Sequence, residues 1–187
     1  MKNLNAKIST TLKALRQEKG WSLDTASQKT GVSKAMLGQI ERGESSPTIA
    51  TLWKISSGFE TSFSSFIDDT FVDSVAPVHR IGDLQQLHPN DDKIRITPLF
   101  SYDKQLSFEV FIIELLPGCE HLSPPHQGSV IEHVVVIEGE MEVLVEGSWR
   151  KLMKNEGLRF NADQAHGYRN TSTHKATFHD IVHYPKQ

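Results

Sequence analysis

The sequence predicts a two-domain protein, with an all-α amino-terminal domain followed by an all-β carboxy-terminal domain. The first observation is charge: residues 1–67 hold nine Lys/Arg and five Asp/Glu, a net charge of +4, and no His. Residues 68–187 hold eleven Lys/Arg and eighteen Asp/Glu, a net charge of −7, and all nine His. The second observation is hydrophobic spacing, which is helical in the first part and strand-like in the second. We expect domains at 1–67 and 93–187, joined by a linker at 68–92.

The overall composition excludes several classes of protein. The 187 residues carry a net charge of −3 and are 37% hydrophobic, which is typical of a globular protein with a real core. No apolar run approaches the roughly 18 residues of a membrane span, so we expect a cytoplasmic protein with no membrane partner. Cys119 is the single cysteine, which excludes an intramolecular disulfide and a thiolate zinc finger. A metal site therefore has to use His and carboxylate side chains.

The first two helices are predicted from apolar spacing and from their end signals. Four apolar side chains fall on one face of the first helix: Leu4, Ile8, Leu12 and Leu15. Gly20 ends this helix, and Ser22 supplies the N-cap of a short second helix.

The third helix is predicted to follow a glycine turn. Gly31 can adopt positive φ, and Ser33 is a good N-cap for a helix from Lys34 to about Arg42. Two apolar side chains share its buried face: Leu37 and Ile40. A second face has no large apolar side chain and is expected to be exposed. Its residues are Lys34, Ala35, Gly38, Gln39 and Arg42.

Two more helices complete the predicted amino-terminal domain. Thr48 caps a fourth helix that Gly58 is expected to end. A short fifth helix is expected to begin at Thr61 or Ser62 and to run through Phe63, Phe66 and Ile67. The result is a five-helix domain that contains a helix, a turn and a helix.

Six runs of residues resemble the XRE family of helix-turn-helix regulators, the phage-repressor type. The runs are Leu12–Arg16, Lys19–Leu23, Thr30–Ser33, Gln39–Gly43, Ser46–Thr48 and Thr51–Ile55. The resemblance implies that the third helix lies in the DNA major groove. It implies base contacts from Ser33, Lys34, Ala35 and Gln39, and phosphate contacts from Ser22, Arg42, Thr48 and Lys54. Lys34 suits guanine, Gln39 suits adenine and the Ala35 methyl suits a thymine methyl.

The carboxy-terminal part reads as short strands separated by turn residues, which predicts a sandwich or barrel. The expected strands are Ile94–Thr97, Leu106–Leu116, Ile131–Ile137, Met141–Val145, Trp149–Leu152, Gly157–Phe160, His166–Asn170 and Ala176–Tyr184. Hairpin turns are expected at 138–140 and 145–149, and an edge strand of the linker is expected near Val78 to Ile81.

Two motifs in this part resemble the cupin superfamily of double-stranded β-barrels. The first consists of Gly118, His126, Glu132 and Gly139, and the second of Gly157, His166 and Asn170. The resemblance implies that metal ligands converge inside the barrel, and the ligands available here are His126, Glu132 and His166. Pro124 occupies the position of the missing first His, for which His121 or His133 are possible substitutes. Such a set can hold a divalent metal such as Zn, Ni, Mn or Fe.

The same inward side chains are the expected binding site of a small-molecule effector: His126, Glu132, His166 and Tyr168. The hydroxyl of Tyr168 can hydrogen-bond an effector, or the residue can be a core aromatic with a polar tip. His133 follows Glu132 directly, so strand alternation sends it to the opposite face.

Three functions are compatible with these motifs. The preferred one is a transcription factor and not an enzyme, in which a homodimer binds a palindromic operator in double-stranded DNA and the cupin domain senses a metabolite. The alternatives are a cupin metalloenzyme fused to a DNA-targeting domain, and a DNA-binding structural protein whose barrel only dimerises. The chain also resembles XRE-cupin regulators of enteric-type bacteria associated with sulfur utilisation, which implies control of sulfur or amino-acid metabolism genes.

Overall fold

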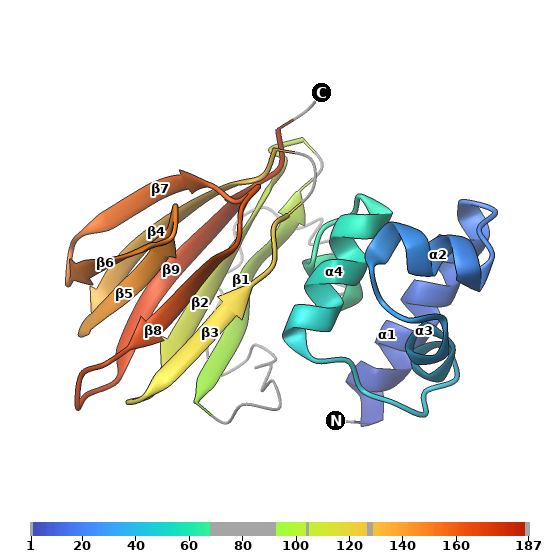
Figure 1. Cartoon of the computed structure of the whole chain (residues 1–187), viewed down its shortest axis with the longest axis horizontal. Coiled ribbons are helices and arrows are strands. Elements are labelled where there is room, and N and C mark those ends of the chain that lie inside the picture. The colour runs from blue at the N-terminus through green and yellow to red at the C-terminus, as the bar shows by residue number, and fades with distance from the viewer. Residues whose placement is uncertain (1, 68–92, 104, 127–128, 186–187) are drawn as a thin grey trace, which may run out of the picture. The chain divides into compact units, whose positions relative to one another are not determined.

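The computed structural model describes residues 2–67, 93–103, 105–126 and 129–185 (Figure 1). The chain divides into two compact units, Met1–Asp69 and Thr70–Gln187. The first is all-α and the second is built on β-strands. The predicted linker and its edge strand near Val78 to Ile81 lie outside the described residues. Within the described part of the chain, no helix is long and apolar enough to cross a membrane.

Residues 2–67, the described part of the amino-terminal unit, form four α-helices and one short 3-10 turn. They are α1 Lys2–Glu18, α2 Leu23–Thr30, α3 Lys34–Glu41, α4 Ile49–Phe59 and the turn η1 Ser64–Phe66. The predicted fifth helix is therefore wrong. The hydroxyls of Thr61 and Ser62 both bond to that of Ser65, and such local side-chain bonds compete with helix formation. Phe63 and Phe66 are nevertheless fully buried, so core packing and not helical propensity fixes this segment.

The predicted helix starts are confirmed by their caps. The hydroxyl of Ser22 accepts the Thr25 N–H at 3.1 Å, and that of Ser33 accepts the Met36 N–H at 3.3 Å. Thr48 caps α4 in the same way. Gly31, at φ +67°, provides the left-handed turn between α2 and α3, as its position predicts. Local hydrogen bonds thus set the angle at which α3 leaves α2.

Gly58 does not end α4, contrary to the prediction. The helix continues to Phe59, and Glu60 takes the left-handed conformation at φ 56°. A Cβ at Gly58 would lie 2.6 Å from the Cα of Thr30, at the end of α2. This glycine is therefore needed for the close crossing of α2 and α4.

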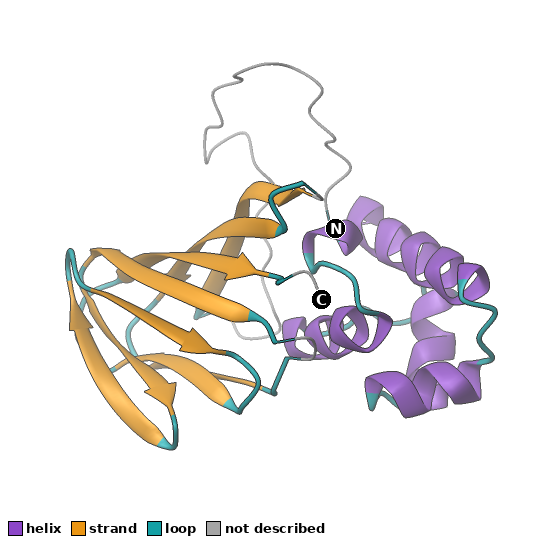
Figure 2. Cartoon of the chain, turned by 90° about the horizontal axis from the view of Figure 1, so that it is seen from above, coloured by secondary structure: helices purple, strands orange, loops and turns teal. Residues whose placement is uncertain are grey.

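The described residues of the carboxy-terminal unit form nine strands in two antiparallel sheets (Figure 2). They are β1 Ile94–Asp103, β2 Phe108–Leu115, β3 Cys119–Ser123, β4 Ile131–Glu138, β5 Glu140–Val145, β6 Ser148–Met153, β7 Gly157–Asn161, β8 His166–Asn170 and β9 Ala176–His183. One sheet has the order β1-β2-β9-β4-β7 and the other β3-β8-β5-β6. Sequence reasoning missed β3, which among the described strands pairs with β8 alone, at the edge of its sheet.

The two sheets pack against each other through alternating inward side chains. In β9, Phe178, Asp180 and Val182 point inward and are buried. The ring of Phe178 lies 5.1 Å, between centroids, from that of Tyr168 in β8 of the opposite sheet. This interior holds the polar side chains described below.

The predicted hairpin at 138–140 is wrong, whereas the one at 145–149 is confirmed. Strands β4 and β5 flank Gly139 but belong to different sheets, so this turn carries the chain from one sheet to the other. Val145 pairs with Ser148, and Glu146 and Gly147 both have positive φ, as a tight two-residue hairpin requires.

Candidate functional site

Helix α3 presents a polar face to solvent. Leu37 and Ile40 are 0% and 1% exposed, and they hold the opposite face of the helix in the core. Four of the predicted DNA-contacting side chains on or beside α3 are exposed: Lys34, Ala35, Gln39 and Arg42. Of the others, Ser22, Ser33 and Lys54 are exposed and Thr48 is half-buried. A short helix that is packed firmly on one side and exposes polar side chains on the other has the dimensions to enter a major groove.

Gly38 does not belong to this exposed face, contrary to the prediction. The residue is buried, and a Cβ added there would lie 3.1 Å from the guanidinium of Arg42 and 3.8 Å from Leu23. The backbone at Gly38 is therefore covered by side chains of its own domain. The small residue makes room for Arg42 and leaves no open surface for a DNA strand.

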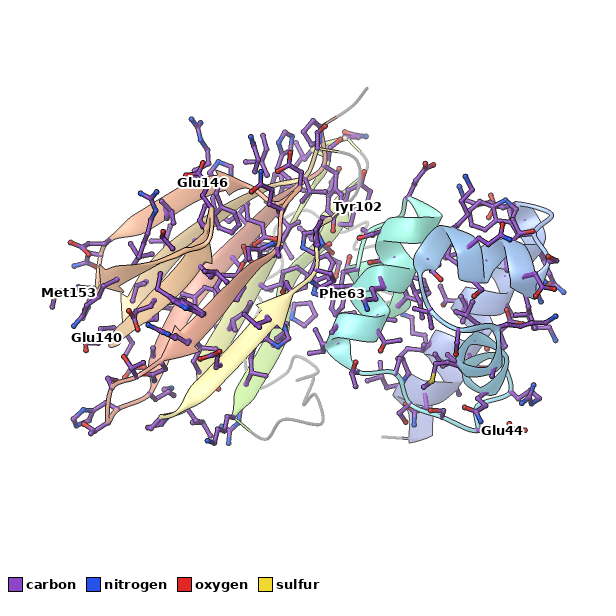
Figure 3. The ribbon with its side chains drawn as sticks, viewed as in Figure 1. Glu44, Phe63, Tyr102, Glu140, Glu146 and Met153 are labelled. Carbon is purple, nitrogen blue, oxygen red and sulfur yellow. The ribbon has the colours of Figure 1, made fainter. Side chains whose placement is uncertain are left out.

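Both cations of this face are held by carboxylates. The Lys34 ammonium lies 2.7 Å from Asp24, and the Arg42 guanidinium donates two hydrogen bonds to Glu44, at 2.8 and 2.7 Å. The hydrogen bonds from Arg42 lower the pKa of the Glu44 carboxyl. Glu44 lies at the surface of the helical unit (Figure 3). Each cation of this face therefore lies next to a negative charge of its own domain.

A second cluster lies inside the barrel, where three predicted side chains come together. His126 precedes β4, Glu132 is in β4 and His166 begins β8, and they are 4%, 1% and 2% exposed. Oε1 of Glu132 lies 3.0 Å from Nε2 of His126 and 3.3 Å from Nε2 of His166. One carboxylate oxygen thus faces both imidazoles.

Neighbouring groups orient this cluster. The Nδ1 atom of His166 lies 2.9 Å from the carbonyl oxygen of Gln164, which makes Nδ1 the donor and turns Nε2 toward Glu132. The hydroxyl of Tyr168 donates a short hydrogen bond to Oε2 of Glu132. Both oxygens of the Glu132 carboxylate are therefore engaged by its neighbours.

The electrostatics of the cluster favour an ionised carboxylate. Burial raises the pKa of Glu132, but hydrogen bonds from His126 and His166 outweigh it and leave the pKa well below its usual range. Burial alone would lower the pKa of His166. The hydrogen bond and the charge of Glu132 outweigh burial, so the pKa of His166 is raised. Burial and the charges of Asp180 and Glu132 raise the pKa of Tyr168, so its phenol stays neutral and donates.

Sequence reasoning missed two further buried carboxyl groups beside the cluster. Asp180 and Glu109 are 4% and 0% exposed. Burial, followed by the charges of Glu132 and Glu109, raises the pKa of Asp180 well above its usual value. Oδ1 of Asp180 has no hydrogen-bond partner in the described structure, whereas Glu109 accepts a short bond from Tyr184. The alternation Phe178, Asp180, Val182 was the available signal for an inward acid.

The donor set fits a divalent metal ion. Ligand atoms of His126, Glu132 and His166 lie within 4.8 Å of one another, and all three residues are buried. Two imidazoles and one carboxylate are the donors of a 2-His-1-carboxylate site. Neither His121 nor His133 belongs to this cluster in the described residues. His133 pairs with Ile181 and Arg159 on the outer face, as strand alternation predicts.

Comparison with known proteins agrees with both units. Residues 12–66 match the helix-turn-helix family model HTH_3, and residues 111–182 match the cupin domain model Cupin_2. The chain is 49% identical over 186 residues to the HTH-type transcriptional regulator SutR of Escherichia coli (strain K12), covering 100% of this chain and 99% of SutR. It is 26% identical to the HTH-type transcriptional regulator PuuR of the same organism, over 86% of each chain. A crystal structure of an HTH_3 family transcriptional regulator from Vibrio cholerae superposes with a TM-score of 0.86, at 45% identity and 99% coverage of each chain.

Proposed function

The chain belongs to the family of HTH-type transcriptional regulators that join a helix-turn-helix domain to a cupin domain, and from that premise we propose that α3 reads an operator while the barrel senses a small molecule. The observation that carries the proposal is the exposed polar face of α3, since the opposite face is held in the core by Leu37 and Ile40. A reading helix needs such a face on a rigid support.

Each exposed side chain of this face has an assigned partner in the proposed complex. Lys34 donates to guanine O6 and N7, Gln39 bonds adenine, and the Ala35 methyl contacts a thymine methyl, with Ser33 beside them. The Arg42 guanidinium binds phosphate and thereby fixes the register of the helix. Three further residues also contact phosphates: Ser22, Thr48 and Lys54.

Operator binding by a homodimer follows from the small size of one helix-turn-helix. A single α3 covers about half of a typical site, so a two-fold pair binds a palindrome with half-sites about one helical turn, roughly 10 bp, apart. The barrel supplies the dimer interface, because the amino-terminal domain uses its apolar faces for its own core.

The barrel cluster is the proposed sensor. His126, His166 and Tyr168 surround the buried carboxylate of Glu132, and the carbonyl oxygen of Gln164 holds His166 in place. A divalent ion such as Zn, Ni, Mn or Fe would be held by His126, Glu132 and His166. When bound, such an ion supplies a Lewis acid that polarises a ligand oxygen or nitrogen. Sensing requires that the effector bind differently to the free and the DNA-bound protein.

The resemblance to sulfur-utilisation regulators supports control of sulfur or amino-acid metabolism genes. A second candidate function is a metalloenzyme targeted to DNA, which the buried 2-His-1-carboxylate donor set favours. We prefer the regulator because operator recognition gives the whole amino-terminal domain a function.

Selection from random duplex DNA tests the proposal. The full-length protein is incubated with a randomised library, and the bound duplexes are sequenced. The expected result is an inverted repeat with half-sites one helical turn apart. Binding without any enriched sequence contradicts operator reading. Repeated turnover of a metabolite by the metal-loaded protein would instead support the enzyme.

A further inference from the structure

The outer face of the four-stranded sheet carries two rows of residues that cross all four strands. The inward side chains of these strands are buried, among them Cys119, Tyr168, Val143 and Leu152, so their chain neighbours face outward. The strand register defines the first row, in the order β3-β8-β5-β6, as Glu120, Arg169, Glu142 and Lys151. The second row, in the same order, is Leu122, Gly167, Leu144 and Trp149. One row is therefore charged and the other is apolar.

The charged row alternates in sign from one edge of the sheet to the other. Its central pair is bidentate, since Nε and Nη2 of Arg169 donate to the carboxylate of Glu142 at 2.8 and 3.1 Å. Glu120 and Lys151 lie on the two edge strands, and both are exposed. They are three strand spacings apart, about 14 Å, so they do not pair within one chain. The row reads negative, positive, negative, positive.

The apolar row lies beside the charged row. Leu122 is 56% exposed, although its side chain is large and apolar. Leu144 and Trp149 are half-buried, and the guanidinium of Arg169 stacks over the Trp149 ring at 4.1 Å from its centroid. Met153, which is 53% exposed, extends the apolar surface at the end of β6 (Figure 3). An apolar strip of this kind beside charged residues is typical of a protein–protein contact.

The order of the charges matches a second copy of the same face. Sheets that pack face to face keep their strands roughly aligned. A two-fold axis parallel to the strands keeps each row level with its own copy and reverses the order of the strands. Glu120 then faces Lys151 of the partner subunit, and Arg169 faces Glu142 of the partner subunit. Every charge of the row therefore meets an opposite charge.

The apolar row is matched by the same axis, because it lies level with its own copy and Leu122 faces Trp149 of the partner subunit. A two-fold axis across the strands does not give this match. It places the charged row either on the apolar row, where the charges have no partners, or on its own copy in unreversed order, where like charges meet. The pattern of the two rows therefore selects one arrangement.

We propose that the outer face of the four-stranded sheet is the homodimer interface, with the two-fold axis parallel to the strands. The proposal rests on the proposed function, because it assigns a surface to the homodimer that binds the operator. The occupant of the face is a second copy of this chain, since the alternating row is complementary to its own reverse.

Charge reversal tests this pairing, with sedimentation velocity of the full-length protein over a concentration series as the measurement. Glu120→Lys places like charges opposite each other at both ends of the charged row, and Lys151→Glu does the same with the other sign. Each variant alone should raise the dimer dissociation constant about tenfold or more. Lys154→Glu makes the same charge change at an exposed position of the turn before β7 and should leave the constant nearly unchanged. Circular dichroism checks that all variants are folded.

Mixing the two variants separates a contact between chains from an effect within one chain. In a mixed dimer each reversed charge faces an opposite charge of the partner, so 1:1 heterodimers should form with nearly the wild-type dissociation constant. This rescue cannot arise within one chain, because Glu120 and Lys151 lie on opposite edges of the sheet. Persistent monomers in the mixture overturn the proposal, as do single variants that dimerise as well as the wild type.

Carbodiimide cross-linking identifies what covers the face, because it joins a carboxylate to an amine in direct contact. The protein is mixed from unlabelled and ¹⁵N-labelled copies so that mass spectrometry distinguishes links between chains from links within one. A link from Glu120 of one copy to Lys151 of another supports the proposal. A link from either residue to the amino-terminal domain of the same chain assigns the face to that domain and overturns it.

The oligomeric state separates this inference from the proposed function. If the wild type and both single variants are dimers of equal affinity, the homodimer stands and this interface fails. If the wild type is monomeric at every concentration, both free and on operator DNA, the homodimer of the proposed function fails together with the interface. A dimer that responds to the variants as expected but selects no inverted repeat keeps the interface and removes operator reading.

Discussion

Arg16 and Glu41 form a bidentate ion pair that joins α1 to the end of α3. Nε and Nη2 of Arg16 donate to the two carboxylate oxygens of Glu41 at 2.6 and 2.8 Å, and the side chains are only 17% and 8% exposed. The hydroxyl of Ser9 in α1 also donates to the carbonyl oxygen of Glu41 at 2.6 Å. Three hydrogen bonds therefore fix α3 on α1, and the position of the exposed polar face of α3 depends on them.

Glu41→Gln should lower the free energy of unfolding by about 1–3 kcal/mol, because it leaves a half-buried guanidinium without its charge partner. The measurement is urea denaturation of the full-length protein. Glu44→Gln is the matched control, since Glu44 makes the same bidentate contact to Arg42 in an exposed position. That pair is fully exposed to solvent, which screens it, so it should contribute less to stability than the Arg16–Glu41 pair. Equal losses for the two variants would show that burial of the Arg16–Glu41 pair is unimportant.

Glu44→Gln should also strengthen binding to both specific and random DNA. The substitution removes a negative charge from the phosphate side of the face and releases Arg42, so affinity should rise a few-fold at low salt and the difference should shrink as salt increases. Fluorescence anisotropy across a salt series measures this. Glu60→Gln, which removes an exposed carboxylate beyond α4, should have a smaller effect. An unchanged affinity for Glu44→Gln would place Arg42 away from the DNA backbone.

Gln39→Ala should cost about 1–3 kcal/mol in binding to the preferred operator while leaving binding to random DNA nearly unchanged. The reason is that a base contact carries sequence information and a phosphate contact does not. Gln28→Ala is the control, because Gln28 is an exposed glutamine on α2. Equal losses on operator and random DNA for Gln39→Ala would remove this residue from the base-reading set.

The features that the sequence predicted are those set by local chemistry. Ser22, Ser33 and Thr48 cap helices through bonds to residues three positions ahead, so the signal lies within one turn of chain. Gly58 was misread because its reason is a crossing with Thr30, which lies far away in sequence. The 3-10 turn at 64–66 was misread for a related reason, since core burial of two phenylalanines dominates there.

The same distinction between local signals and distant contacts applies to the barrel site. The resemblance to the cupin motifs pointed to His126, Glu132 and His166, which the structure brings together, and strand alternation correctly predicted that His133 faces outward. The backbone carbonyl of Gln164 that orients His166 has no side-chain signature, so sequence reasoning could not find it. Strand β3 was missed because its inward residues Cys119, His121 and Ser123 do not form an apolar alternation.

Asp180→Asn should stabilise the protein more at about pH 8 than at about pH 5. The folded-state pKa of Asp180 is raised, so the folded protein holds this proton more tightly than the unfolded chain does. Stability contributed by the protonated carboxyl is therefore present below the unfolded pKa, about 3.9, and is lost as the pH rises toward the folded pKa. The amide cannot ionise and escapes this loss. Urea denaturation at the two pH values measures the difference, and an identical difference at both would contradict a raised pKa.

Addition of Zn²⁺ or Ni²⁺ should raise the unfolding temperature of the full-length protein, because three buried donors are already assembled in the folded state and are separate in the unfolded chain. A metal binds the neutral imidazole, and the pKa of His166 is raised by the hydrogen bond and charge of Glu132, so the stabilisation should begin to weaken while the pH is still above the ordinary histidine value of about 6.5. His166→Ala should abolish most of the metal-dependent stabilisation.

With nine histidines in the chain, metal binding elsewhere has to be separated from metal binding at this site. His179→Ala serves this purpose because His179 lies on the outer face of β9, opposite in direction to Asp180. If the His179 variant loses as much stabilisation as the His166 variant, the metal binds at the surface and the buried cluster is a hydrogen-bonded site for the effector alone.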